Sequence, residues 1–228
     1  MDYLHNLVFG IYPYVALAIF FMGSLIRFDR EQYTWKSDSS QLLRGKQLRL
    51  GSNLFHIGVL FLFFGHAAGL LTPHWLYEGL GLSTPNKQMM AIISGGIAGS
   101  ICMAGILVLL NRRLSDARIL ATSKPMDIII LLWIFVTLSL GLVSILSSLE
   151  HREGGVMLQL GFWAQHIVTF RAGAAEALIN VPFIYKLHLF FGMSVFVLFP
   201  FTRLVHVWSG FGALGYLVRS YQVVRQRG

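Results

Sequence analysis

Four histidines lie inside long apolar stretches of the sequence, where an ionisable side chain is costly and is therefore a candidate for function. They are His56, His66, His188 and His206. One histidine in such a place is more often satisfied by a hydrogen bond to a neighbouring carbonyl. Four of them, divided two and two between two stretches, favour a shared role in binding a metal through imidazole nitrogen or in relaying protons. The other four need no special explanation, because they fall at stretch ends or in polar segments: His5, His74, His151 and His166.

The stretches that carry these histidines belong to a membrane protein. Of the 228 residues, 55% are apolar and only 12% are charged, which is too few charges for a water-facing surface. Segments 7–26, 50–71, 89–110 and 128–149 contain no formal charge and are each 20 to 22 residues long, enough to cross a bilayer as helix. A fifth crossing is predicted over 182–208, with Lys186 and Arg203 reaching outward along the helix.

The sequence therefore predicts an all-α integral membrane protein with a single membrane domain, 1–228, and five transmembrane helices in a bundle. The predicted spans are 4–26, 50–72, 89–110, 127–149 and 182–208, followed by a tail at 209–228. In the long connection at 150–181, apolar residues recur at helical spacing, which predicts an amphipathic helix on the outer surface. Such a helix either lies in the lipid interface or packs as a lid over the bundle.

Basic residues in the loops predict the orientation of the bundle. Fourteen of the 18 lysines and arginines fall in 27–50, in 111–126 or from Arg203 onward, and the other four lie on the opposite side. The positive-inside rule therefore predicts an outer N-terminus, a cytoplasmic C-terminus and an uncleaved first helix in a cell membrane of bacterial or archaeal type. Because the basic residues occupy loops and form no patch, a nucleic-acid partner is excluded. The single cysteine, Cys102, leaves no thiolate pair for covalent haem, zinc or an iron–sulfur cluster.

The second and fifth spans cross the membrane in opposite directions, so each histidine of one span lies at a similar depth to one histidine of the other. His56 then faces His206 near the inner side, and His66 faces His188 near the outer side. At about 1.5 Å per residue, the two histidines are separated by roughly 15 Å on the second span and roughly 27 Å on the fifth. Tilted helices and tilted rings are expected to absorb this mismatch. Glycines at 58, 65, 69 and 192 offer room between the helices, although glycine in a span is more often used for helix packing.

Each pair of imidazoles fits a haem better than it fits zinc. Zinc usually takes three or four protein ligands, and no thiolate or carboxylate accompanies either pair within the spans. A haem supplies four nitrogens itself and needs two axial ligands, so two non-covalent, bis-histidine b haems are predicted. A haem-free transporter or anchor that uses the histidines for proton relay or packing is the alternative from a different class. A transporter of this kind would more naturally carry a buried carboxylate.

Several motifs along most of the chain resemble the gamma subunit, cytochrome b, of membrane-bound respiratory nitrate reductase. They are IYPY at 11–14, QYTW at 32–35, SNLFHIG at 52–58, GH at 65–66, LTPHW at 71–75, WAQ at 163–165, VTF at 168–170, KLHL at 186–189 and LFPFTRLVHVWS at 198–209. The resemblance implies five helices with an outer N-terminus. It also implies two b haems, the proximal one on His56 and His206 and the distal one on His66 and His188.

The same resemblance implies a quinol site beside the distal haem, with Lys87 as a site residue just before the third span. An alternative is that Lys87 is an interface anchor that reaches to the membrane surface. Arg112 and Arg113, at the inner end of the third span, are predicted to pair with propionates of the proximal haem, although positive-inside topology alone also accounts for them. Lys87 and His66 would then hold the quinone oxygen and accept a proton.

The implied function is oxidation of membrane quinol near the outer face, with electrons passing inward to a partner in the cytoplasm. The implied partners are an iron–sulfur (beta) subunit, docked on loop 27–50 with Tyr33 and Trp35 and on the tail after Trp208, and a molybdenum catalytic (alpha) subunit beyond it. Nitrate itself would not touch this chain. A related b-type subunit that serves a different cytoplasmic reductase, such as a sulfite-reducing or heterodisulfide complex, is the alternative within the same class.

Overall fold

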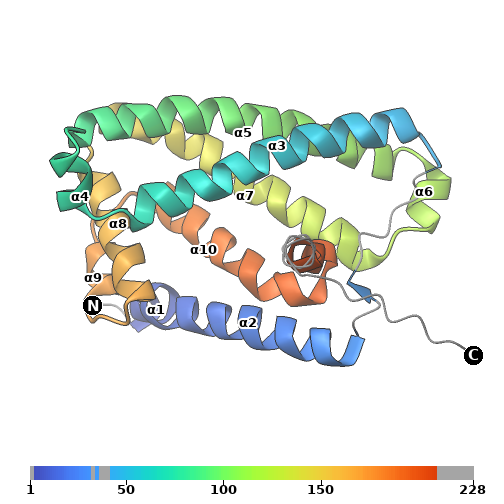
Figure 1. The fold of residues 1–228 in the computed structure, drawn as a ribbon, viewed down its shortest axis with the longest axis horizontal. Coiled ribbons are helices and arrows are strands. Elements are labelled where there is room, and N and C mark those ends of the chain that lie inside the picture. The colour runs from blue at the N-terminus through green and yellow to red at the C-terminus, as the bar shows by residue number, and fades with distance from the viewer. Residues whose placement is uncertain (1–2, 32–33, 36–41, 210–228) are drawn as a thin grey trace, which may run out of the picture.

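A computed structural model of the chain describes residues 3–31, 34–35 and 42–209. Within these residues, five helices are long and apolar enough to cross a membrane: Tyr3–Glu31, Gly45–Leu71, Thr84–Leu114, Pro125–Glu150 and Phe183–Phe201. The prediction of an all-α membrane protein with five spanning helices is confirmed. The helices run side by side in a bundle, and the short connecting helices gather at its two ends (Figure 1).

The first long helix consists of α1 (Tyr3–Asn6), a π-helical turn (Leu7–Ile11) and α2 (Tyr12–Glu31). The other long helices are α3 (Gly45–Leu71), α5 (Thr84–Leu114), α7 (Pro125–Glu150) and α10 (Phe183–Leu198). Proline in the first turn starts α5 and α7, where a missing N–H leaves no helical bond unmade. Two 3₁₀ turns, Phe199–Phe201 and Arg203–Val205, follow α10.

The shorter helices distinguish the two ends of the bundle. At one end lie α4 (His74–Gly79), α8 (Gly155–Val168) and α9 (Ala174–Ala177), together with α1; we call it the α8 end (Figure 1). At the other end lies α6 (Ala117–Ala121), beside the segment that leads into α3; we call it the α6 end. Asp116 caps α6 by accepting hydrogen bonds from the backbone N–H groups of Arg118 and Ile119.

Glycine allows α3 and α5 to pack closely along their length. A Cβ atom on Gly58 of α3 would lie 2.6 Å from the Cβ of Cys102 on α5, so a side chain there would displace one of the helices. Gly58 thus serves helix packing. In contrast, a Cβ on Gly65, Gly69 or Gly192 would meet no described atom within 4 Å. These three glycines therefore leave open space beside their helices and do not serve close helix packing as Gly58 does.

The predicted amphipathic helix forms as α8 and packs as a lid across the α8 end. Trp163 is buried, and its indole N–H donates to the carbonyl of Phe9 over 2.9 Å. That carbonyl is available because Pro13, four residues later, has no N–H to donate to it. Gln165 donates to the carbonyl of Leu70 at the last turn of α3 over 3.0 Å. The opposite face of α8, with half-exposed Phe162 and Val168, points away from the bundle.

Candidate haem-binding sites

The four histidines of the apolar stretches come together as two pairs. The ring centroids of His56 and His206 are 6.0 Å apart, and those of His66 and His188 are 6.1 Å apart. His56 and His66 belong to α3, whereas His188 belongs to α10 and His206 follows its second 3₁₀ turn. Among the described elements, α3 packs on α5 and α8, while α10 packs on α7 and α2. The histidines therefore reach toward each other from helices that other elements support.

The ring orientation of all four histidines follows the same pattern. Each Nδ1 lies within hydrogen-bond distance of a backbone carbonyl oxygen, which can only accept. Each Nδ1 therefore carries the hydrogen, and Nε2 keeps the lone pair that binds a metal. The four carbonyls and their distances from Nδ1 are Ser52 for His56 at 2.7 Å, Leu62 for His66 at 2.7 Å, Thr137 for His188 at 3.0 Å and Arg203 for His206 at 2.6 Å.

The fifth helix is broken between His188 and His206, so the separation expected for one straight helix does not apply to them. The predicted continuous helix over 182–208 is wrong: α10 ends at Leu198, and Thr202 is extended, with φ −122° and ψ 179°. Pro200 causes the break, because it lacks an N–H and its ring clashes with the preceding turn. Arg27 donates to the carbonyls of Pro200 and Thr202 over 2.7 and 2.9 Å, which satisfies two groups left over by the break. His206 is thus not one straight helix away from His188.

The spacing of each pair suits two imidazoles that share one metal atom. A metal–imidazole bond of about 2.0–2.1 Å, with the ring centre about 1.1 Å beyond the nitrogen, places the two centroids about 6.3 Å apart. The distances of 6.0 and 6.1 Å are close to this value. Among the described residues no group of three or more His, Cys, Asp or Glu is placed to hold a metal ion. Two imidazoles per site fit a haem, which brings its other four ligands with it.

Helix α7 makes room for the His188 ring, a role that histidine spacing alone did not reveal. A Cβ on Gly141 would lie 2.9 Å from Cε1 of His188. One turn earlier, Thr137 supplies the carbonyl that accepts from His188 Nδ1. The spacing of these two residues, one helical turn apart, places both on the α7 face toward α10. In the sequence, a glycine in the fourth span was the only available signal.

At the α6 end, the His56 and His206 rings line a cavity of about 230 Å³. The predicted residues Arg112 and Arg113 line it too, and both are nearly fully buried, at 2% and 7% exposed. The lining contains two further charged residues, Arg203 and Asp127, for which the sequence alone indicates no site. Positive-inside topology explains arginines at this end, but not why they turn inward. Their position suits negatively charged groups bound in the cavity.

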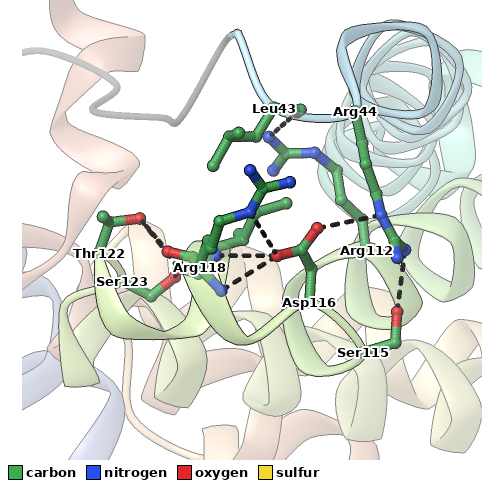
Figure 2. Close-up of polar contacts among 9 residues, drawn as sticks. Leu43, Arg44, Arg112, Ser115, Asp116, Arg118, Thr122 and Ser123 are labelled. Atoms are coloured by element: carbon green, nitrogen blue, oxygen red, sulfur yellow. Dashed lines mark hydrogen bonds and ion pairs between the residues drawn. The ribbon is translucent and has the colours of Figure 1, made fainter.

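A polar network beside α6 positions the arginines (Figure 2). Arg112 donates to the carbonyl of Leu43 over 2.8 Å, in the segment before α3. Arg44 pairs with Asp116 over 3.2 Å and donates to the Ser115 hydroxyl over 3.1 Å. Desolvation raises the pKa of the Asp116 carboxyl, but the N–H donors of Ile119 and Arg118 and the nearby Arg44 guanidinium outweigh it and leave that pKa below its usual value.

Lys87 is buried at the α8 end, with only 8% of its surface exposed. Its ammonium donates to the carbonyl of Gly69 over 3.0 Å and lies 3.9 Å above the ring centre of Tyr77. Gly69 is less than one turn beyond His66 on α3, so the amine bonds to the same end of α3 that carries that histidine. An interface anchor would extend outward instead.

Part of the predicted docking surface lies outside the described residues. Tyr33 and the tail from 210 onward are not described. The described residues of the loop at 27–50 and of the segment before the tail are in contact, because the Ser209 hydroxyl donates to the carbonyl of Trp35 over 3.1 Å. The Trp35 ring also contacts Phe28, with centroids 5.1 Å apart.

Comparison with known proteins decides the family. The family model described as nitrate reductase gamma subunit matches residues 5–227. The chain belongs to this family. It is 48% identical to the respiratory nitrate reductase 1 gamma chain of Escherichia coli K12 over 227 residues, covering 100% of both chains. It is 40% identical to the nitrate reductase gamma chain of Bacillus subtilis 168 over 222 residues, which is 97% of this chain and 98% of the other.

A less similar relative is a larger protein. The nitrate reductase-like protein NarX of Mycobacterium tuberculosis is 29% identical over 228 residues, but the match covers only 34% of that protein. The match to the E. coli gamma chain, in contrast, covers 100% of both chains. The resemblance seen in the sequence motifs is thus confirmed at the level of the family.

Proposed function

We propose that this chain is the dihaem cytochrome b subunit of a respiratory nitrate reductase. The observation that carries the proposal is the presence of two histidine pairs at different depths, with centroids 6.0 and 6.1 Å apart and every Nδ1 bound to a carbonyl. His56 and His206 would hold one haem b at the α6 end, and His66 and His188 would hold the other at the α8 end. Each haem supplies one-electron redox chemistry.

The α6 end faces the cytoplasm in this proposal, because ten of the 14 lysines and arginines among the described residues lie toward that end and four lie toward the α8 end. The names of the relatives with similar chains place them in respiratory nitrate reductases. Electrons would therefore leave at the α6 end to an iron–sulfur subunit and reach nitrate at a molybdenum subunit beyond it. Trp35, Ser209 and the segment before α3 would belong to the docking surface.

Quinol oxidation is assigned to the α8 end, beside His66 and Lys87. A quinol gives up two electrons and two protons, while electrons pass inward one at a time. The Lys87 ammonium is a buried donor whose present acceptor is the Gly69 carbonyl. Exchanging that carbonyl for a quinol oxygen would orient the substrate beside the His66 pair. Protons released here would leave on the outer side, so that electron transfer separates charge across the membrane.

Stopped-flow reduction of the purified complex by a short-chain quinol tests this function. Replacing His66 by Ala should lower the rate of haem reduction by at least about 100-fold, because the acceptor next to the quinol is lost. His206→Ala should leave the remaining haem reducible by quinol but lower nitrate reduction by a similar factor. His166→Ala is the matched control, since its Nδ1 bonds to the Ala172 carbonyl on the surface and it belongs to neither pair. Equal effects of His66→Ala and His206→Ala on quinol-driven reduction would contradict the assignment.

A further inference from the structure

Asp127 is a buried carboxylate held between arginines of two other elements. It lies in the first turn of α7 and is 8% exposed. One carboxylate oxygen is 3.7 Å from the Arg113 guanidinium of α5, and the other is 3.7 Å from Nε of Arg203, which follows the helix break. Burial at this degree strengthens both attractions relative to surface ion pairs. Asp127 thus joins α5, α7 and the segment after α10 at the α6 end.

The same three residues line the cavity beside the His56 and His206 rings. Together with Arg112, they are the charged residues of its lining, and three guanidinium groups with one carboxylate give a net charge of two positive units. A haem b carries two propionate groups of one negative charge each. The lining therefore balances the charge of the two propionates. Without the carboxylate, the cavity would hold one positive charge in excess.

Arg203 connects Asp127 to the histidine pair itself. Its side chain pairs with Asp127, and its backbone carbonyl accepts the Nδ1–H of His206 over 2.6 Å. That hydrogen bond fixes which nitrogen of His206 faces the cavity. Arg203 begins the short 3₁₀ turn after the extended Thr202, so its position depends on the chain path after the break. Asp127 on α7 therefore affects both the net charge of the cavity and, through Arg203, the position of the His206 ring.

We propose that Asp127 is the positioning residue of the α6-end site: it holds Arg113 and Arg203 against the cavity and limits the positive charge that faces the bound haem. The inference rests on the dihaem assignment of the proposed function. Reduction adds one negative charge at a haem, and nearby positive charge favours the reduced form. Asp127 therefore lowers the midpoint potential of the α6-end haem below the value that three arginines alone would give.

Equilibrium redox titration of the α band in the purified complex tests the proposal without quinol turnover. Asp127→Asn should shift the midpoint potential of the α6-end haem upward and leave that of the α8-end haem unchanged. Asp127→Glu, which keeps the charge, should remain close to wild type. Asp116→Asn is the matched control, because Asp116 is also an aspartate paired with an arginine at this end but does not line the cavity. The shift in the midpoint potential of the α6-end haem should be smaller in Asp116→Asn than in Asp127→Asn. The His206→Ala variant identifies which component of the titration belongs to the α6 end.

Three results would overturn the proposal: an unchanged α6-end potential in Asp127→Asn, an equal shift of both haems, or a shift no larger than that of Asp116→Asn. If Asp127→Asn does not accumulate, Arg203→Gln probes the same pair with the opposite sign. It removes a positive charge and must lower the α6-end potential, and an unchanged or raised value would contradict the proposal. Dithionite and mediators reduce the haems in these titrations. A failure of quinol oxidation would therefore leave the titration intact, whereas absence of either haem would remove its component.

Discussion

The two histidine pairs have nearly the same ring spacing but different electrostatic surroundings. The pair at the α6 end shares a cavity with three arginines and one aspartate. At the α8 end, the Nδ1 atoms of His66 and His188 bond to the carbonyls of Leu62 and Thr137, and the His188 ring packs against Gly141. Lys87 is a buried cation at the same end of the bundle. The same ligand set can therefore carry different potentials. Because net positive charge favours the reduced haem, the α6-end haem should have the higher midpoint potential, which directs electrons inward.

Of the substitutions that distinguish the two ends of the bundle, Lys87→Ala at the α8 end should have the largest effect, which is on quinol oxidation. Lys87→Ala takes away a buried charged donor, and a charged hydrogen bond contributes about 1.5–3 kcal/mol. We expect kcat/KM for quinol to fall by about 10- to 100-fold, because each 1.4 kcal/mol corresponds to a factor of ten. Haem content and spectra should change little, since Lys87 belongs to neither histidine pair. The midpoint potential of the α8-end haem should fall, because a positive charge is removed at that end, and that of the α6-end haem should stay unchanged.

Lys186→Ala is a control on the same side of the membrane, because its ammonium is at the surface and donates to the carbonyl of Ile179. Steady-state quinol oxidation by both variants, with haem content measured in parallel, separates the two roles of Lys87. Unchanged quinol kinetics in Lys87→Ala would assign that residue to packing alone.

Gly141→Ala should weaken retention of the α8-end haem and leave retention of the α6-end haem unchanged. Its added Cβ in Gly141→Ala would lie 2.9 Å from the His188 ring, so the ring must tilt. Overpacking at such a site typically costs about 1–3 kcal/mol, which corresponds to roughly 5- to 150-fold weaker retention of the bound group. Haem content per chain, with the redox titration of the remaining haem, measures the loss.

Gly96→Ala on α5 is the matched control, because a Cβ there would meet only Cδ1 of Ile145 at an ordinary distance of 3.8 Å. We expect it to keep both haems. Loss of the α6-end component in Gly141→Ala would contradict the assignment of His188 to the α8 end.

The sequence predicted the long helices and the histidine depths, because apolar length and the cost of buried polarity are local properties. It did not predict the break at Thr202, since apolar residues continue on both sides of Pro200 and the Arg27 side chain that stabilises the break comes from α2. Asp127 and Arg203 were missed for a related reason. Each occupies a place at a helix end where topology alone explains a charge, and only the tertiary structure turns them toward one cavity.

The smallest expected effect is the pH dependence of the network beside α6. Because the pKa of Asp116 is lowered in the folded chain, its ionised form stabilises the fold above the unfolded value of about 3.9. This contribution is lost as the pH falls from that value through the lower folded pKa. A small decrease in Tm of Asp116→Asn relative to wild type at pH 7 should therefore disappear in that acidic window. A difference in Tm that persisted below it would mean that the carboxylate charge is not the source.

Redox titration of the wild-type complex, followed at the b-type α band, tests the central claim most directly. The account predicts two components of equal amplitude, of which the higher-potential one disappears in His206→Ala and the lower-potential one in His66→Ala. A single component, or both variants losing the same one, would contradict the arrangement of two haems held by α3 and the fifth helix.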